Sequence, residues 1–92
     1  MIIVFDDAAN EDIRRIFEWI EQDSPAAARR MISRIERRVR QLMIPGLAHI
    51  GRSGLVVGTR ELVVPPYLVV YKVDDDRKEI RVLSIVHGAR SR

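Results

Sequence analysis

The sequence contains no cysteine, and its 92 residues include only one Trp, two Tyr and two Phe. Without cysteine, neither disulfides nor thiolate metal sites hold the fold together, and nothing marks an oxidising compartment. Residues 1–5 lack the charged leader and longer apolar core of a signal peptide, and no stretch approaches the roughly 20 apolar residues of a membrane span. The sequence therefore predicts a cytoplasmic protein with no membrane partner.

Patterns that would carry metal or cofactor chemistry are missing as well. The two histidines, His49 and His87, lie far apart, and neither has an acid or a second histidine at a ligand-like spacing. Gly51 and Gly54 flank a serine without the lysine and helix start of a phosphate-binding loop. No serine is paired with a base and an orienting acid, as a nucleophile requires. We expect neither a metal nor a cofactor.

Charge is distributed unevenly along the chain. The net charge is +3, but residues 1–23 hold seven acids against two arginines, whereas residues 24–60 hold eight arginines against one acid. A chain of this length forms one domain, here residues 1–92, so both groups of charges share one small surface. Such a polarised surface can attract nucleic acid, an acidic protein segment or anionic lipid.

Hydrophobic periodicity predicts the order of elements. A β-branched strand ends at Asp6, and two amphipathic stripes follow at helical spacing, separated by Gln22-Asp23-Ser24. Three strands come next, and Pro65-Pro66 end the first of them. The expected elements are a strand over 2–5, helices over 7–22 and 25–43, and strands over 56–64, 67–73 and 79–86. This order, β-α-α-β-β-β, predicts an α+β fold with an antiparallel helical hairpin on one face of a mainly antiparallel sheet.

Alternation in the last strand predicts which side chains face the helices. The expected core face holds Ile80, Val82, Ser84 and Val86, and the other face holds Arg81, Leu83, Ile85 and His87. Arg60, Arg81 or His87 is then expected to line the helix-free face of the sheet. The alternative is that the arginines are ordinary surface residues and that the histidine caps the sheet.

The second predicted helix has a polar side that is almost wholly cationic, formed by Arg29, Arg30, Arg34, Arg37, Arg38 and Arg40. One interpretation is a binding face, because guanidinium groups match carboxylates and phosphates. The other is a solvated face balanced by the first helix through Glu11, Glu18 and Glu21. Trp19 lies off the apolar stripe of the first helix and is either an exposed contact residue or partly buried against the hairpin.

Short motifs along nearly the whole chain resemble the ParE branch of the RelE/ParE toxin superfamily of bacterial toxin–antitoxin systems. They are Ala9–Ile16, Ser24–Ala28, Gly51-Arg52, Gly58–Leu62, Tyr67–Tyr71 and His87–Arg90. Each is weak alone, but their order and spacing are specific. The resemblance implies the fold predicted above and a type II toxin, neutralised by a cognate ParD-like antitoxin in a hetero-oligomer.

The resemblance also implies how such a toxin acts. RelE-type members cleave messenger RNA on the ribosome, and Arg60 and Arg90 match two of the cations in their pattern. Leu62 and Leu68 stand where other cations are found, and the sequence ends before a late tyrosine; one missing charge-stabilising donor typically costs about 3–4 kcal/mol. We therefore expect a ParE-type toxin that binds and inhibits DNA gyrase. A messenger RNA endonuclease, with His87 as acid or base, is the alternative, and a non-toxic binding module is the third.

The expected sites follow from these interpretations. The antitoxin is expected to contact Trp19 and the second helix through Arg29, Arg30, Arg34, Arg37 and Arg38. The expected functional face contains Arg52, Arg60, Arg81, His87 and Arg90. If the toxin is an enzyme, its catalytic candidates are Arg60, His87 and Arg90. The scarcity of aromatic rings for base stacking argues against direct nucleic-acid binding.

Overall fold

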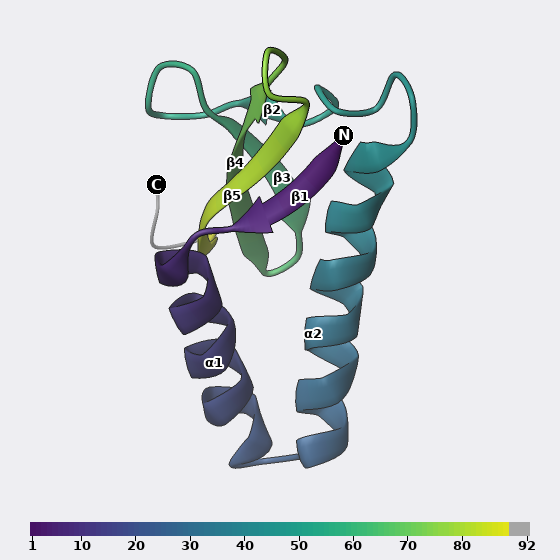
Figure 1. The fold of residues 1–92 in the computed structure, drawn as a ribbon. Coiled ribbons are helices and arrows are strands. Elements are labelled where there is room, and N and C mark those ends of the chain that lie inside the picture. The colour runs from purple at the N-terminus through teal and green to yellow at the C-terminus, as the bar shows by residue number, and fades with distance from the viewer. Residues whose placement is uncertain (89–92) are drawn as a thin grey trace.

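In the computed structural model, which describes residues 1–88, two helices pack against one five-stranded sheet (Figure 1). The helices are α1 (Asp7–Glu21) and α2 (Pro25–Arg40), and a 3-10 turn over Gln41–Met43 extends α2. The strands are β1 (Ile2–Phe5), β2 (Arg52–Ser53), β3 (Arg60–Val64), β4 (Tyr67–Asp74) and β5 (Glu79–His87). The predicted α+β class and order of the main elements are confirmed. Strand β2 is an addition, since two residues are too few to show a period.

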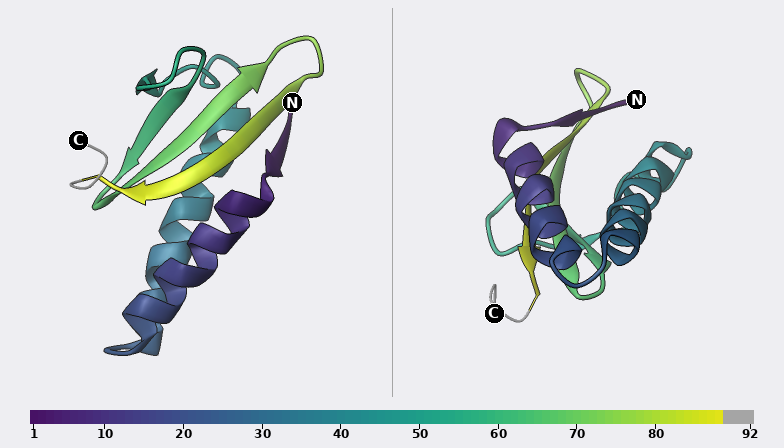
Figure 2. Two further views of the ribbon diagram at one scale, coloured as in Figure 1. Left: turned by 90° about the vertical axis from the view of Figure 1, so that its left-hand side faces the viewer. Right: turned by 90° about the horizontal axis from the view of Figure 1, so that it is seen from below.

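The sheet runs in the order β1-β5-β4-β3-β2 and is mainly antiparallel. Strand β1 differs, because it pairs in parallel with β5, where Val4 lies opposite Arg81. Both helices lie on the same face of the sheet (Figure 2), with α1 against β5 and α2 against β3. β3 ends before Pro65-Pro66, as the missing amide donors predict.

The helical hairpin is longer than the sheet beneath it. Ser24 caps α2, because its Oγ accepts a hydrogen bond from the Ala27 amide at 3.1 Å. The hairpin end projects beyond the sheet in Figure 1, and the molecule is 42 Å long and 25 Å wide. The core lies toward the sheet, where Ile35, Val39 and Val69 share one cluster at 1 % exposure or less. No helix of residues 1–88 is long and apolar enough to cross a bilayer.

A bulge interrupts the ladder between β4 and β5. Val70 lies opposite Ser84, but the next residue of β4, Tyr71, lies opposite Val82. Leu83 is therefore an extra residue on β5, and the strand changes phase at that point. Beyond the bulge, the side chains of β5 still alternate between the two faces of the sheet, but each lies on the face opposite to the one that strict alternation predicts.

This change of phase corrects the predicted core face of β5. Ile80 is fully buried as expected, but beyond the bulge the buried residue is Ile85, at 4 % exposure. The placement of Ser84 and Val86 in the core was wrong, because both are only partly buried. Strict alternation fails wherever a strand gains one residue, since every later side chain moves to the other face.

The segment before β3 is a turn rather than the start of a strand. The strand expected over 56–64 begins only at Arg60, because residues 54–59 form a hydrogen-bonded turn. The Gly54 amide donates a hydrogen bond to the Thr59 carbonyl at 2.9 Å. The two valines of this turn have high strand propensity, yet both are exposed, so the local sequence pattern was misleading.

One buried hydroxyl fastens the loop over residues 44–51 to the sheet. The Tyr71 hydroxyl donates to the Ala48 carbonyl and accepts from the Gly51 amide, both at 3.0 Å. Burial raises the pKa of Tyr71 above its ordinary value. Gly51 has no room for a side chain, since a Cβ would lie 2.7 Å from the same hydroxyl oxygen. Tyr71 thus holds the loop against the sheet.

We expect Tyr71→Phe to lower the free energy of unfolding by about 1–3 kcal/mol, because buried hydrogen-bonding groups of Ala48 and Gly51 lose their partner. Urea denaturation measures the difference. Tyr67→Phe is the matched control, since within residues 1–88 the Tyr67 hydroxyl makes no hydrogen bond, and it should change stability by less than about 0.5 kcal/mol. Equal losses in the two variants would contradict the anchoring role.

The raised pKa of Tyr71 also predicts sensitivity to alkali. The folded protein holds this proton more tightly than the unfolded chain, whose ordinary pKa is 10.0. The resulting stabilisation is complete below that pH and is lost as the pH rises toward the folded-state pKa. Above about pH 10 the stability of the unsubstituted protein should fall more steeply than that of Tyr71→Phe. Parallel curves would show that Tyr71 does not cause the decline.

Candidate functional site

A groove of about 520 Å³ opens between α1 and the adjoining ends of β4 and β5. Asp12, Ile16 and Trp19 form its wall, because they follow one another along one side of α1. Its floor includes Tyr67 and His87 from the sheet. We call this the α1–sheet groove; its lining consists of Asp12, Arg15, Ile16, Trp19, Tyr67, Ile85, Val86 and His87. Aromatic rings beside charged groups are typical of protein-binding surfaces.

Trp19 is the most exposed aromatic side chain of this groove. Its side chain is 70 % exposed, so partial burial against the hairpin, one of the two alternatives, does not occur. An indole left in water contributes little to folding, whereas tryptophan dominates the binding energy of many protein interfaces. The position of Trp19 beside a groove agrees with a contact residue.

Asp12 joins the wall of the groove to its floor. Its carboxylate accepts a hydrogen bond from the Ile85 amide at 2.9 Å, and it lies 3.6 Å from the Arg15 guanidinium. The Ile85 amide comes just after the bulge, where regular pairing is interrupted. Asp12 was not among the predicted site residues, because helical periodicity does not reveal a contact with a strand 73 positions away.

His87 lies on the helix side of the sheet, in the α1–sheet groove. Its ring meets Tyr67 edge to face, with centroids 5.7 Å apart and planes at 77°, and the two residues are opposite each other in the ladder. The expectation that His87 lines the helix-free face was wrong, because the bulge at Leu83 moves it to the opposite face. It lines the groove together with residues of α1, whereas Arg81 lies on the other side of the sheet.

Arg60 also differs from its expected position. It alternates with Glu61 and shares a face with Leu62, which belongs to the core, so it lies on the helix side rather than the helix-free side. Its guanidinium donates to the carbonyls of His49 at 3.0 Å and Gly51 at 2.8 Å. Arg60 therefore supports the same loop as the buried tyrosine.

Arg60 and His87 lie toward opposite ends of the sheet. Arg60 is opposite Tyr71, and His87 is opposite Tyr67. The two tyrosines are four positions apart on β4, about 14 Å along an extended strand. One bound phosphodiester cannot span that distance. Arg90, the third catalytic candidate, lies outside the described residues.

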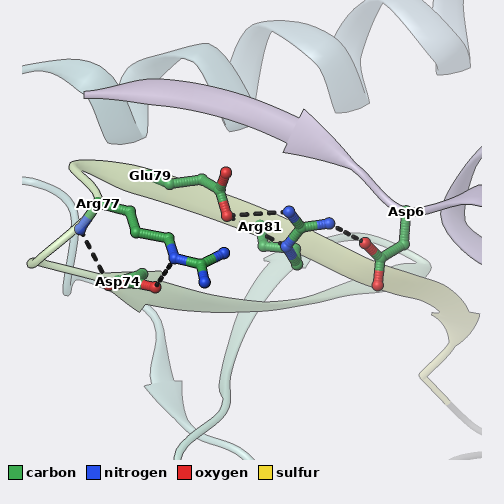
Figure 3. A network of polar contacts seen from close by, with 5 residues as sticks. All are labelled: Asp6, Asp74, Arg77, Glu79 and Arg81. Atoms are coloured by element: carbon green, nitrogen blue, oxygen red, sulfur yellow. Dashed lines mark hydrogen bonds and ion pairs between the residues drawn. The ribbon is translucent and has the colours of Figure 1, made fainter.

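Arg81 lies on the helix-free side, as expected, but is bound to two acids (Figure 3). Its guanidinium is 2.5 Å from Asp6 and 3.0 Å from Glu79. The hydrogen bond to Asp6, and then the one to Glu79, raise the pKa of Arg81. This network ties the start of α1 to β5. Its contacts indicate a structural role for Arg81.

Arg52 makes a comparable contact at the other edge of the sheet. Its Nε lies 3.2 Å from the carboxylate of Glu61, whose side chain is only 3 % exposed, whereas Arg52 itself is half exposed. A buried carboxylate requires such compensation. Of the expected functional face, the structure places Arg52, Arg60, Arg81 and His87 in separate surroundings rather than in one cluster.

Five of the six arginines of α2 are exposed, and Arg38 is half-buried. Four of them line a shallow groove of about 490 Å³ on the outer side of the helix: Arg29, Arg30, Arg34 and Arg37. Arg34 donates to the Pro65 carbonyl at 3.0 Å, and Arg38 donates to Gln41 at 2.6 Å. Within residues 1–88 no ion pair joins these arginines to an acid, so the predicted balance by α1 acids is not found. Those acids include Glu11, which pairs with Arg14 instead.

Within residues 1–88, no three His, Asp or Glu side chains lie close enough together to hold a metal ion. The features of the described chain are therefore a groove with an exposed tryptophan, an arginine face on α2 and several structural ion pairs. The groove and the arginine face are features of binding surfaces, whereas the ion pairs hold the fold together.

The fold is that of toxins from toxin–antitoxin systems. Over 95 % of both chains it matches a structure of the chromosomal ParDE system from P. aeruginosa, with a TM-score of 0.81 and 24 % identity. It also matches a chain of the RelBE2 toxin–antitoxin complex from Mycobacterium tuberculosis, with a TM-score of 0.64 and 18 % identity over 94 % of this chain and 95 % of the other.

The sequence narrows this class to one family. Residues 3–92 match the family described as "ParE toxin of type II toxin-antitoxin system, parDE". A relative from Sinorhizobium fredii (strain NBRC 101917 / NGR234), named "Putative toxin Y4kP", is 35 % identical over 81 residues, covering 83 % of this chain and 79 % of the relative. The chain belongs to the ParE toxin family. The resemblance drawn from its short motifs is thereby confirmed.

Proposed function

We propose that this ParE-family toxin inhibits DNA gyrase by binding it and performs no bond-making chemistry of its own. The observation that carries the proposal is the separation of the catalytic candidates in the described chain. Arg60 is hydrogen-bonded to loop carbonyls, and His87 lies about 14 Å farther along the strands beside Tyr67. A messenger RNA nuclease needs converging groups for proton transfer and charge stabilisation.

The structure also supports a position for the apolar contacts of a neutralising antitoxin. We place them in the α1–sheet groove, because Trp19 and Tyr67 offer apolar rings there beside the charged Asp12 and Arg15. A flexible segment that folds on binding must bury apolar surface to offset its loss of conformational entropy. Arg52 and Arg81 remain candidates for the surface that meets the target, since both are partly exposed.

The purified toxin is expected to stop gyrase from supercoiling relaxed plasmid in the presence of ATP. The physical reason is occlusion or trapping of a gyrase surface by a protein ligand, which requires no turnover by the toxin. A supercoiling assay on agarose gels measures the inhibition. A parallel translation reaction on purified ribosomes reports whether messenger RNA stays intact.

A type I topoisomerase relaxing the same plasmid is the matched control. Loss of both topoisomerase activities would indicate coating of the DNA rather than binding to gyrase. Active gyrase together with cut messages on ribosomes would replace the proposal with the nuclease alternative. Active gyrase with intact messages and normal bacterial growth on induction would instead support a non-toxic binding module.

A further inference from the structure

We propose that the outer face of α2 is a binding site for the phosphate backbone of double-stranded DNA. The site consists of four exposed arginines around a shallow groove, Arg29, Arg30, Arg34 and Arg37, with Ser33 between them. This inference is independent of gyrase inhibition. It differs from the expectation against direct nucleic-acid binding, which rested on the scarcity of aromatic rings for base stacking. Contacts to a phosphate backbone need no such rings.

The arginines form a continuous patch because of their helical positions. At 3.6 residues per turn, all four fall within an arc of about 140°, on the side opposite the buried Ala28, Ile35 and other core residues of α2. Arg30 and Arg34 are four positions apart, and Arg34 and Arg37 are three apart, so their like charges repel one another on the helix surface. The fold leaves this repulsion uncompensated.

Acids of the described chain do not neutralise the patch. Glu36 is the one acid of α2, and it lines a different groove, beside β1. Within residues 1–88, Arg29, Arg30 and Arg37 make no hydrogen bond or ion pair, and Arg34 binds only the Pro65 carbonyl. A concentrated positive charge without an internal partner is an electrostatic match for a polyanion.

The shape of the patch favours a duplex backbone over the other polyanions. The arginines stand on the outside of a straight helix, spread over about 12 Å of its axis between Arg29 and Arg37. A DNA duplex presents roughly one charge per 1.7 Å, or about seven over that length. Single-stranded nucleic acid would also require aromatic stacking partners, but Trp19 lies in the groove on α1 instead.

An acidic peptide fits the same charges less well. A peptide that orders on binding must bury apolar side chains, and apart from the small Ala26 the groove on α2 is lined by polar and charged residues only. The large exposed apolar side chains, such as Trp19 and Val57, lie on other elements. Phosphate binding needs no apolar contact, because its driving force is the release of counterions from the nucleic acid.

The test is binding of the full chain to a fluorescent 20-base-pair duplex, measured by anisotropy from 50 to 200 mM salt with two unrelated sequences. Four phosphate contacts predict a slope of log K against log salt of about −3.6, which is an approximately 150-fold loss of affinity over this range. The two sequences should bind equally, since backbone contacts carry no base information.

A pair of charge-matched variants isolates the patch. The test variant is Arg29→Gln/Arg30→Gln/Arg34→Gln/Arg37→Gln. The control removes four cations elsewhere and is Arg14→Gln/Lys72→Gln/Arg77→Gln/Lys78→Gln. The test variant should lose most of the salt dependence and bind at least 10-fold more weakly than the control, while circular dichroism shows both folded.

Three results would overturn the proposal. Equal weakening in the two variants would mean that net charge alone attracts the duplex. An unchanged salt slope in the test variant would place the contacts elsewhere. Tighter binding of a poly-glutamate peptide than of the duplex, lost in the same variant, would make α2 a site for an acidic protein segment.

Discussion

Replacing Ile35 with alanine is expected to lower the free energy of unfolding by about 2–5 kcal/mol, which is a large part of the stability of a small domain. Ile35 is fully buried on α2, in the cluster that joins the helical hairpin to the sheet. Removing its outer carbons leaves a cavity that neither the helix nor the sheet can close without moving. Urea denaturation followed by circular dichroism measures the loss.

Ile2→Ala is the control for the same chemical change. Ile2 is 62 % exposed on the edge strand β1, so its substitution should change stability by no more than about 0.5 kcal/mol. Comparable losses at the two positions would mean that the hairpin cluster is not the core of this protein. A small effect at Ile35 alone would mean that the helices repack freely on the sheet.

Replacing Trp19 with alanine is expected to weaken antitoxin binding by about 30-fold or more, the equivalent of at least about 2 kcal/mol. The expectation follows from the proposed docking in the α1–sheet groove. Because the side chain is 70 % exposed, the same change should leave the stability of the free toxin nearly unaltered. Calorimetric titration with a ParD-type antitoxin that binds the unsubstituted toxin measures the affinity.

Val57→Ala provides a comparison for this substitution. Val57 is fully exposed in the turn before β3 and does not line the α1–sheet groove. Truncating it removes exposed apolar surface without touching the proposed contact. Wild-type affinity in Trp19→Ala, or a larger loss in Val57→Ala, would place the antitoxin on another part of the toxin.

Much of the fold was predictable because its signals are local. The stripes of α1 and α2 and the break at Pro65-Pro66 each depend on neighbouring residues, and all agree with the structure. The wrong start of the strand before Arg60 also has a local cause. The valines of the turn over 54–59 have the composition of a strand, but hydrogen bonds within the turn determine its conformation.

The candidate site was less predictable because it depends on distant contacts. The bulge at Leu83 is visible only in the register of β4 and β5, and it moves His87 into the groove beside α1. Asp12 gains its contact with the Ile85 amide through the same change. For Arg60, the partners are carbonyls of a loop whose path has no periodic signal.

The sequence by itself determined the family, the fold class and the concentration of arginines on one side of α2, because each is encoded in short-range pattern and composition. Only the tertiary structure decided which arginines of the described chain have an acidic partner. It paired Arg81 and Arg52 with acids, turned Arg60 toward a loop and left the α2 arginines without an acidic partner in the described chain. Whether a charge is neutralised depends on which distant residue folding brings within a few ångströms, and residue spacing does not contain that distance.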